Sequence, residues 1–218
     1  MTELDLVALD RQIIACARCP RLVAWRFQVA QEKKKQFQHC EYWGKAVPNF
    51  GDPDATKLIV GLAPAAHGAN RTGRMFTGDR SGDWLYRALH KAGLAELPTS
   101  ESKTDSQRLY GVLITALVHC APPDNKPLPA EFAACRPYFS TILHACAWRA
   151  ILCLGKLAWD ATLRELDAPR AAFSHSASIR TDADTRIFAS YHPSQQNTFT
   201  GKLTEPMLDA VIEVFRDA

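Results

Sequence analysis

The sequence predicts an α/β fold, with a three-layer α/β/α arrangement around a central four-stranded parallel sheet. Two observations support this. Short apolar runs, typical of buried strands, alternate with segments of helical periodicity, which is the pattern of parallel strands joined by crossover helices. Irregular segments rich in glycine, proline and polar residues follow the first and the last run, as at the ligand sites of open parallel sheets. The four runs are residues 58–61, 112–117, 150–154 and 187–190.

The chain before the first strand indicates two helices and a loop. Residues 3–15 carry apolar side chains at helical spacing, and residues 23–35 form a second expected helix. The second helix ends in three consecutive lysines, residues 33–35, which we interpret as an exposed charged face. Residues 47–53 are rich in turn-forming residues and predict a loop.

The segments between the strands complete the expected domain. Residues 82–91 have helical periodicity, whereas residues 98–107 and 121–129 are polar or proline-rich and predict surface loops. No repeat or composition shift divides the chain. We therefore expect one domain, residues 1–218, with an N-terminal extension of about residues 1–50 folded onto it.

Composition narrows the class of protein. The chain has 218 residues, of which 47% are apolar, so it can bury a sizeable core and is not largely disordered. Its net charge of +3, from 26 basic and 23 acidic residues, is compatible with local binding of a polyanion. No apolar run approaches a membrane span and the start lacks a signal-peptide pattern, so we expect a cytoplasmic protein with no membrane partner.

Seven cysteines in such a chain favour a metal site or catalysis over disulfides, and an odd number excludes complete pairing. Cys16 and Cys19 form a C-x2-C pair, Cys120 follows the second strand, and Cys135 lies 15 residues further on. Four thiolates from distant segments suit tetrahedral zinc or a cubane iron–sulfur cluster.

Other residues near these cysteines have expected roles. Four basic side chains flank the sulfurs and are candidates to offset their charge: Arg18, Arg21, His119 and Arg136. Cys146 and Cys153 stand in apolar context and are expected to be small core residues, while Cys40 has no clear assignment.

The two strand-exit segments are the most informative part of the chain. Residues 61–79 read Gly-Leu-Ala-Pro-Ala-Ala-His-Gly-Ala-Asn-Arg-Thr-Gly-Arg-Met-Phe-Thr-Gly-Asp, and residues 192–201 read His-Pro-Ser-Gln-Gln-Asn-Thr-Phe-Thr-Gly. The small residues of the first segment allow its backbone to approach a ligand closely. Because parallel strands end at one edge of a sheet, we expect both segments to line one site.

These segments, together with the order of the four cysteines, resemble the uracil-DNA glycosylase superfamily, specifically its iron–sulfur type, family 5 (type b). The resemblance covers residue 16 to about residue 204. It implies a monofunctional DNA N-glycosylase of base excision repair, which flips uracil out of DNA and hydrolyses its N-glycosidic bond to leave an abasic site. DNA with deaminated bases, single- or double-stranded, is the implied partner, and we expect a monomer.

The resemblance also implies a cofactor. Cys16, Cys19, Cys120 and Cys135 are its expected ligands to a 4Fe–4S cluster, which would tie the N-terminal extension to the loop after the second strand.

Within the two segments the resemblance places His192 against a carbonyl oxygen of the departing base, where it stabilises the developing negative charge, and Phe76 against the face of the flipped base. Taken singly, His192 has the alternative of a structural loop residue and Phe76 that of a core residue. Asn70 is our first choice to orient the attacking water, and Asp79 is the second. Further base contacts are expected from Leu62, Ala63, Pro64 and His67, and DNA contacts from Arg71, Arg74, Ser194, Asn197, Phe199 and Lys202.

Two departures from the family pattern affect the chemistry. Ala63 stands where most families of the superfamily have Asp or Asn, which removes a simple general base. Thr115 and Ala116 stand where related enzymes have an Asn that reads the uracil edge. Losing that amide weakens discrimination, so we expect excision of hypoxanthine as well, with xanthine as a further candidate. No lysine of the two segments is placed for Schiff-base chemistry, so no lyase activity is expected.

Two other interpretations remain open from the sequence. A non-catalytic zinc or iron–sulfur nucleic-acid-binding module accounts for the cysteines but not for the two polar strand-exit segments. A flavodoxin-like or iron–sulfur electron-transfer protein is the second, although the chain lacks a G-x-G-x-x-G fingerprint.

Overall fold

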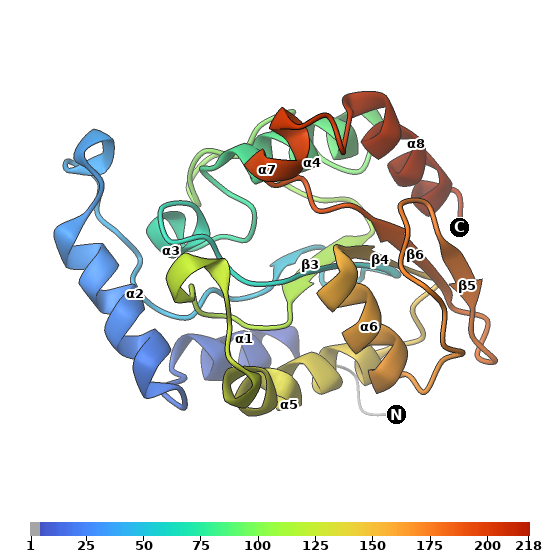
Figure 1. Cartoon of the computed structure of the whole chain (residues 1–218), viewed down its shortest axis with the longest axis horizontal. Coiled ribbons are helices and arrows are strands. Elements are labelled where there is room, and N and C mark those ends of the chain that lie inside the picture. Colours follow the sequence, from blue (N-terminus) through green and yellow to red (C-terminus); the bar gives the residue numbers. More distant parts are fainter. Residues whose placement is uncertain (1–4) are drawn as a thin grey trace.

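A six-stranded sheet runs through the centre of the computed structural model, which describes residues 5–218 (Figure 1). The strand order is β1-β3-β2-β4-β6-β5. The four central strands are parallel: β2 (Lys57–Gly61), β3 (Val112–Ala116), β4 (Ala150–Leu154) and β6 (Arg186–Ser190). They confirm the four strands predicted from the apolar runs.

The two edge strands were not predicted, so the expectation of a four-stranded sheet is corrected to six strands. β1 (Phe50–Gly51) pairs antiparallel with β3, and β5 (Ser178–Arg180) pairs antiparallel with β6. β1 is two residues long and lies within the segment predicted as a loop, while β5 is mostly exposed and has no apolar run. Edge strands need only one buried face, so neither carries the signal of a buried strand.

Helices cover both faces of the sheet and confirm the three-layer architecture (Figure 1). The helices α4 (Arg80–Lys91) and α8 (Glu205–Arg216) lie on one face, and α1 (Leu6–Ile14), α5 (Pro129–Ala145) and α6 (Lys156–Glu165) lie on the other. Alternate residues of β4 serve the two layers, because Ile151 and Cys153 join one core cluster and Leu152 the other.

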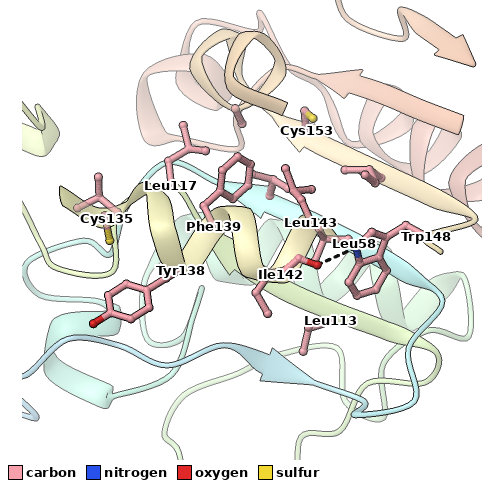
Figure 2. Packing of buried hydrophobic residues seen from close by; sticks show 14 of the residues in the cluster. Leu58, Leu113, Leu117, Cys135, Tyr138, Phe139, Ile142, Leu143, Trp148 and Cys153 are labelled. Carbon is pink, nitrogen blue, oxygen red and sulfur yellow. Dashed lines mark hydrogen bonds between the residues drawn. The ribbon is translucent and has the colours of Figure 1, made fainter. Parts of the chain in front are cut away.

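The packing of α5 shows how the helices α1, α5 and α6 are attached to their face of the sheet (Figure 2). Phe139 and Ile142 belong to one buried cluster with Leu58 and Leu113 of the sheet. Trp148 belongs to the same cluster, and its indole Nε1 donates a hydrogen bond to the carbonyl oxygen of Ile142 at 3.0 Å. Burying each large apolar side chain is worth about 1.5–3 kcal/mol, so α5 is firmly fixed to the sheet.

Helix boundaries shift slightly from those predicted. The helix α2 (Pro20–Glu32) starts earlier than expected because proline is favoured at the first helical position. It ends at Glu32, since Lys33 adopts a left-handed φ of +53°, and a 3₁₀ turn, η1 (Lys35–Phe37), follows. Asp79 caps α4, which therefore begins at Arg80. Residues 3 and 4 of the first expected helix lie outside the described residues.

Three short elements stand near the carboxyl ends of the parallel strands: α3 (Ala69–Thr72), the 3₁₀ turn η2 (Pro123–Asn125) and α7 (Gln195–Phe199). In the described part of the chain, no helix has the length and apolar character needed to cross a membrane.

Candidate active site

A cleft of about 770 Å³ opens where the parallel strands end. β2 and β6 both end at it, with β4 between them, so the two segments singled out from the sequence meet there as expected. Eight of the predicted site residues line the cleft: Leu62, Ala63, Pro64, His67, Phe76, Asp79, His192 and Ser194.

Phe76 is half-buried in the cleft lining and packs against the backbone of Gly61. Its φ of +52° is in the left-handed region, which is uncommon for a bulky residue. Its ring lies directly over Gly61, where a Cβ would come within 3.0 Å of two ring carbons. A Cβ on Gly82 would lie 1.8 Å from the Phe76 carbonyl oxygen. Two glycines therefore allow the ring to take this position.

His192 faces Phe76 from the end of β6. The ring centroids lie 5.9 Å apart and the planes are tilted by 30°. The amide Nδ2 of Asn197 donates to the carbonyl oxygen of His192 at 2.8 Å and so fixes its backbone. Burial lowers the pKa of His192 to about 4. Among residues 5–218 no group hydrogen-bonds its imidazole, which is thus neutral at physiological pH with an N–H available to a ligand.

Asp79 and His67 are the other polar side chains that the first segment places in the cleft. Asp79 accepts a hydrogen bond from the Gly82 amide at 3.0 Å, and burial raises its pKa. Its carboxylate lies against Gly68, where a Cβ would be 1.9 Å from Oδ2. The Nδ1 atom of His67 hydrogen-bonds the Tyr42 hydroxyl at 3.1 Å.

Asn70 does not lie in the cleft, so our first choice of a water-orienting residue is wrong. Its side chain is fully buried, and its Nδ2 lies 3.4 Å from the carbonyl oxygens of Arg26 and Ala66, to which it donates. The amide therefore lies between the backbone of α2 and that of Ala66, and Asn70 itself is not part of the cleft lining.

Arg74 is also wrong as a phosphate contact. It is buried and donates to Ser100 Oγ at 2.6 Å and to Asp105 at 2.5 Å. Arg71 donates to the carbonyl oxygens of His67 and Gly78, both at 2.8 Å, so its guanidinium braces the first segment instead of lining the cleft.

The remaining predicted DNA contacts lie outside the cleft lining. Phe199 ends α7 with 68% of its surface exposed, and the Arg80 guanidinium stacks on it at 4.6 Å. Lys202 lies over the ring of Tyr191 at 4.8 Å. Asn197 supports the His192 backbone, as described above. An exposed aromatic at the tip of a short helix suits a residue that inserts into DNA, and this role stays a prediction.

Several cleft residues were missed from the sequence. Lys34, Gln36 and Phe37 reach the cleft from the N-terminal extension, and η2 contributes from another side. Local patterns carry no signal for these, because the contacts span distant parts of the chain. Ala116 was predictable as a strand end, and it does line the cleft, whereas Thr115 is buried. The additional lining residues include Arg80, Ser81, Asp124, Asn125, Lys126, Gln195 and Gln196.

The four cysteines singled out from the sequence line one small cavity between α2, α5 and the end of β3: Cys16, Cys19, Cys120 and Cys135. The Arg26 guanidinium donates to Cys120 Sγ at 2.8 Å and to the Cys16 carbonyl oxygen at 3.0 Å. The His119 amide lies 3.4 Å from Cys135 Sγ. Burial raises the pKa of Cys19, of Cys120 and, to about 12, of Cys135, which favours their neutral thiols.

The charges around this cavity differ from those expected. Arg18 and His119 line it, but Arg21 pairs with Glu131 at 2.7 Å and Arg136 with Glu165 at 2.8 Å. Arg26, which the sequence did not single out, is the buried donor. Cys153 is a core residue as predicted, while Cys146 and Cys40 are half-buried. Within residues 5–218 no group of three or more His, Cys, Asp or Glu is placed to hold a metal ion.

Comparison with known proteins adds a family. The family model described as the uracil DNA glycosylase superfamily matches residues 48–216. A type-5 uracil-DNA glycosylase of Mycobacterium leprae is 50% identical over 96% of this chain and 93% of its own. One from Thermus thermophilus is 46% identical over 98% of both chains. A type-4 uracil-DNA glycosylase of Pyrobaculum aerophilum is 34% identical over 77% of this chain and 69% of its own.

Proposed function

Because the chain belongs to the type-5 uracil-DNA glycosylases of the uracil DNA glycosylase superfamily, we propose that the cleft between Phe76 and His192 takes up a uracil flipped out of DNA. The protein is a hydrolase of N-glycosyl bonds, and its products are the free base and an abasic site. One observation carries the assignment of the site: on the segments that follow β2 and β6, an aromatic ring faces a neutral imidazole that no group of residues 5–218 hydrogen-bonds.

Phe76 holds the base by stacking. Every base has a π-face, and base–aromatic stacking is worth about 1–3 kcal/mol per base. The ring packs against Gly61, and this contact prevents it from moving toward the sheet when a base binds. Small side chains at Ala63 and Ala116 leave the rest of the pocket to backbone groups.

His192 stabilises the leaving group. The N-glycosidic bond breaks with negative charge moving onto the base, and the imidazole N–H donates a hydrogen bond to the base oxygen that receives it. The pKa of about 4 keeps the imidazole neutral, and a neutral imidazole still carries one N–H that can donate. Asn197, through the His192 carbonyl oxygen, holds the strand exit in place.

Asp79 orients the attacking water in this proposal. It replaces Asn70, which lies outside the cleft, and it lines the cleft close to Gly68. Only modest base strength is needed, because most of the barrier lies in the departure of the base. Ser194, at the cap of α7, contacts a phosphate beside the flipped nucleotide.

The residues that line the pocket suggest which damaged bases the enzyme excises. Ala116 offers no side-chain amide to read the uracil edge, and a cleft of about 770 Å³ has room for a purine. We therefore propose that hypoxanthine, and xanthine as a further candidate, are excised along with uracil.

The cysteine cavity fits a 4Fe–4S cluster held by Cys16, Cys19, Cys120 and Cys135. The support for this proposal is that the four sulfurs line one cavity between segments far apart in the sequence. The cluster, when bound, supplies a cross-link between the N-terminal helices and the end of β3. Arg26 offsets thiolate charge at Cys120.

Single-turnover excision tests the proposal. Labelled oligonucleotides containing uracil, hypoxanthine or xanthine, in single- and double-stranded form, are mixed with excess enzyme and the abasic sites are cleaved with alkali. His192→Ala should slow uracil excision about 10²–10³-fold, the usual cost of one oxyanion donor. His144→Ala, an exposed histidine on α5, is the matched control and should change the rate less than about twofold.

Each part of the experiment has an outcome that would contradict the proposal. A near wild-type rate for His192→Ala would refute the role of this imidazole. Excision of uracil alone would refute the broad range. DNA binding with no base release by the wild type would favour the non-catalytic nucleic-acid-binding module.

A further inference from the structure

We propose that residues 33–37, called here the lysine arm, grip phosphates of the DNA strand that enters the cleft. The arm joins α2 to the rest of the chain and lies at the C-terminal end of that helix, in light blue in Figure 1. This inference rests on the proposed function and adds a DNA-binding element from the N-terminal extension.

The arm belongs to the same cleft as the base pocket. Lys34, Gln36 and Phe37 line that cleft together with Phe76 and His192, although they precede β1 in the sequence. An exposed face of a helix was expected at this point. Instead, α2 ends at Glu32, where Lys33 adopts a left-handed φ, and residues that follow line the cleft.

Two tethers hold the arm in place. The Arg71 guanidinium lies over the Phe37 ring at 3.9 Å, and the same guanidinium is fixed to two carbonyl oxygens of the first strand-exit segment. The Lys34 amide lies 3.4 Å from the Tyr42 hydroxyl, which in turn bonds His67. A tethered segment loses less conformational freedom on binding than a free loop, so its charges are already positioned for a ligand.

The charges of the arm have no acidic partner in the described part of the chain, although the Lys33 ammonium donates to the Gln38 carbonyl oxygen at 3.4 Å. None of the ion pairs within residues 5–218 includes Lys33, Lys34 or Lys35. Lys34 and Lys35 are exposed. After burial, the charge of Lys34 is the next cause that lowers the pKa of His67, so its positive field reaches the cleft.

The chemistry of the expected occupant matches this charge. A nucleotide flipped into the cleft keeps its flanking phosphates at the mouth, where exposed ammonium groups and the Gln36 amide can contact them. On the η2 side, Lys126 adds a further cation to the cleft lining, and Asp124 adds an anion. Contacts of this kind fix the strand without reading its sequence.

Binding measurements with charge-removing variants test the arm. The double variant Lys34→Gln/Lys35→Gln is compared with Arg164→Gln/Arg170→Gln, which removes the same charge from exposed positions at the end of α6 and just after it. The probe is duplex and single-stranded DNA with one tetrahydrofuran abasic analogue, and the dissociation constant Kd is measured by fluorescence anisotropy between about 50 and 200 mM salt.

We expect the arm variant to raise Kd several-fold and to reduce the slope of log Kd against log salt by about 0.9 for each phosphate that the protein no longer neutralises. Its excision rate should fall at limiting enzyme and recover at saturating enzyme. Lys34→Arg/Lys35→Arg keeps the charge and should keep the wild-type slope.

Two results would overturn the inference: a salt slope equal to that of the wild type, or equal changes in the arm variant and the α6 control. A wild-type protein that binds the probe but releases no uracil would instead overturn the proposed function, and the slopes would still decide the role of the arm. Circular dichroism melts establish that each variant is folded.

Discussion

The pH dependence of base excision should show no titration near pH 6.5, because His192 stays neutral well below that value. Burial lowers the pKa of this imidazole from 6.5 to about 4. Desolvation disfavours the charged form, so the imidazole becomes protonated only at a lower pH than an exposed histidine. The charged residues that line the same cleft are Lys34, Asp79, Arg80, Asp124 and Lys126.

The size of the effect can be worked out at pH 5.5. An ordinary histidine with a pKa of 6.5 would be about nine-tenths protonated, whereas one with a pKa of about 4 is only about 3% protonated. An excision rate carried by the neutral imidazole therefore falls by only a few per cent at pH 5.5. With an ordinary imidazole, the same rate would fall about tenfold.

The assay is single-turnover excision of uracil at saturating enzyme from about pH 4.5 to about pH 8. Circular dichroism over the same pH range establishes that the protein stays folded. Asp79→Asn serves as a companion, since burial raises the pKa of Asp79 and its protonation could add a second acid limb. Phe76→Ala exposes the imidazole and should move the midpoint up toward 6.5. A midpoint near 6.5 that persists in Asp79→Asn would refute the assignment of a desolvated, neutral donor.

Three substitutions extend these expectations. Gly61→Ala puts a Cβ 3.0 Å from the Phe76 ring. It should lower the free energy of unfolding by about 1–3 kcal/mol and slow excision; an unchanged denaturant midpoint would contradict the close contact. Arg26→Gln removes the guanidinium that donates to Cys120 Sγ, and should speed the loss of the visible absorption of the proposed iron–sulfur cluster under chelator. Arg26→Lys should lose this absorption more slowly than Arg26→Gln; equal decay of wild type and Arg26→Gln would count against this role. Asp79→Ala removes a helix cap and should cost about 1 kcal/mol in thermal melts, whereas Asp79→Asn should keep the cap and lose only activity.

The layered fold could be predicted because its central strands are buried on both faces. Continuous apolar runs such as residues 150–154 mark such strands plainly, and the intervening helices then follow. The edges could not be predicted in the same way. β5 is exposed and three residues long, so its pairing with β6 is set by the neighbouring strand and not by its own residue types.

The site was predictable where chain topology determines position and not where side-chain direction does. His192 and Phe76 follow strand ends, and strand ends converge. Asn70 sits in the same segment, but one helical turn rotates it toward the Arg26 backbone. The lysine arm depends on contacts between residues far apart in the chain, such as Phe37 with Arg71, which no local pattern reveals.

The glycines beneath the pocket limit how this enzyme can be altered. At Gly61, Gly68 and Gly82 the space of a side chain is already filled by the Phe76 ring, the Asp79 carboxylate or a carbonyl oxygen. Random mutagenesis will find almost no tolerated change at these positions. Efforts to redirect the enzyme to another lesion should instead vary the half-buried alanines that line the cleft, Ala63, Ala65 and Ala66.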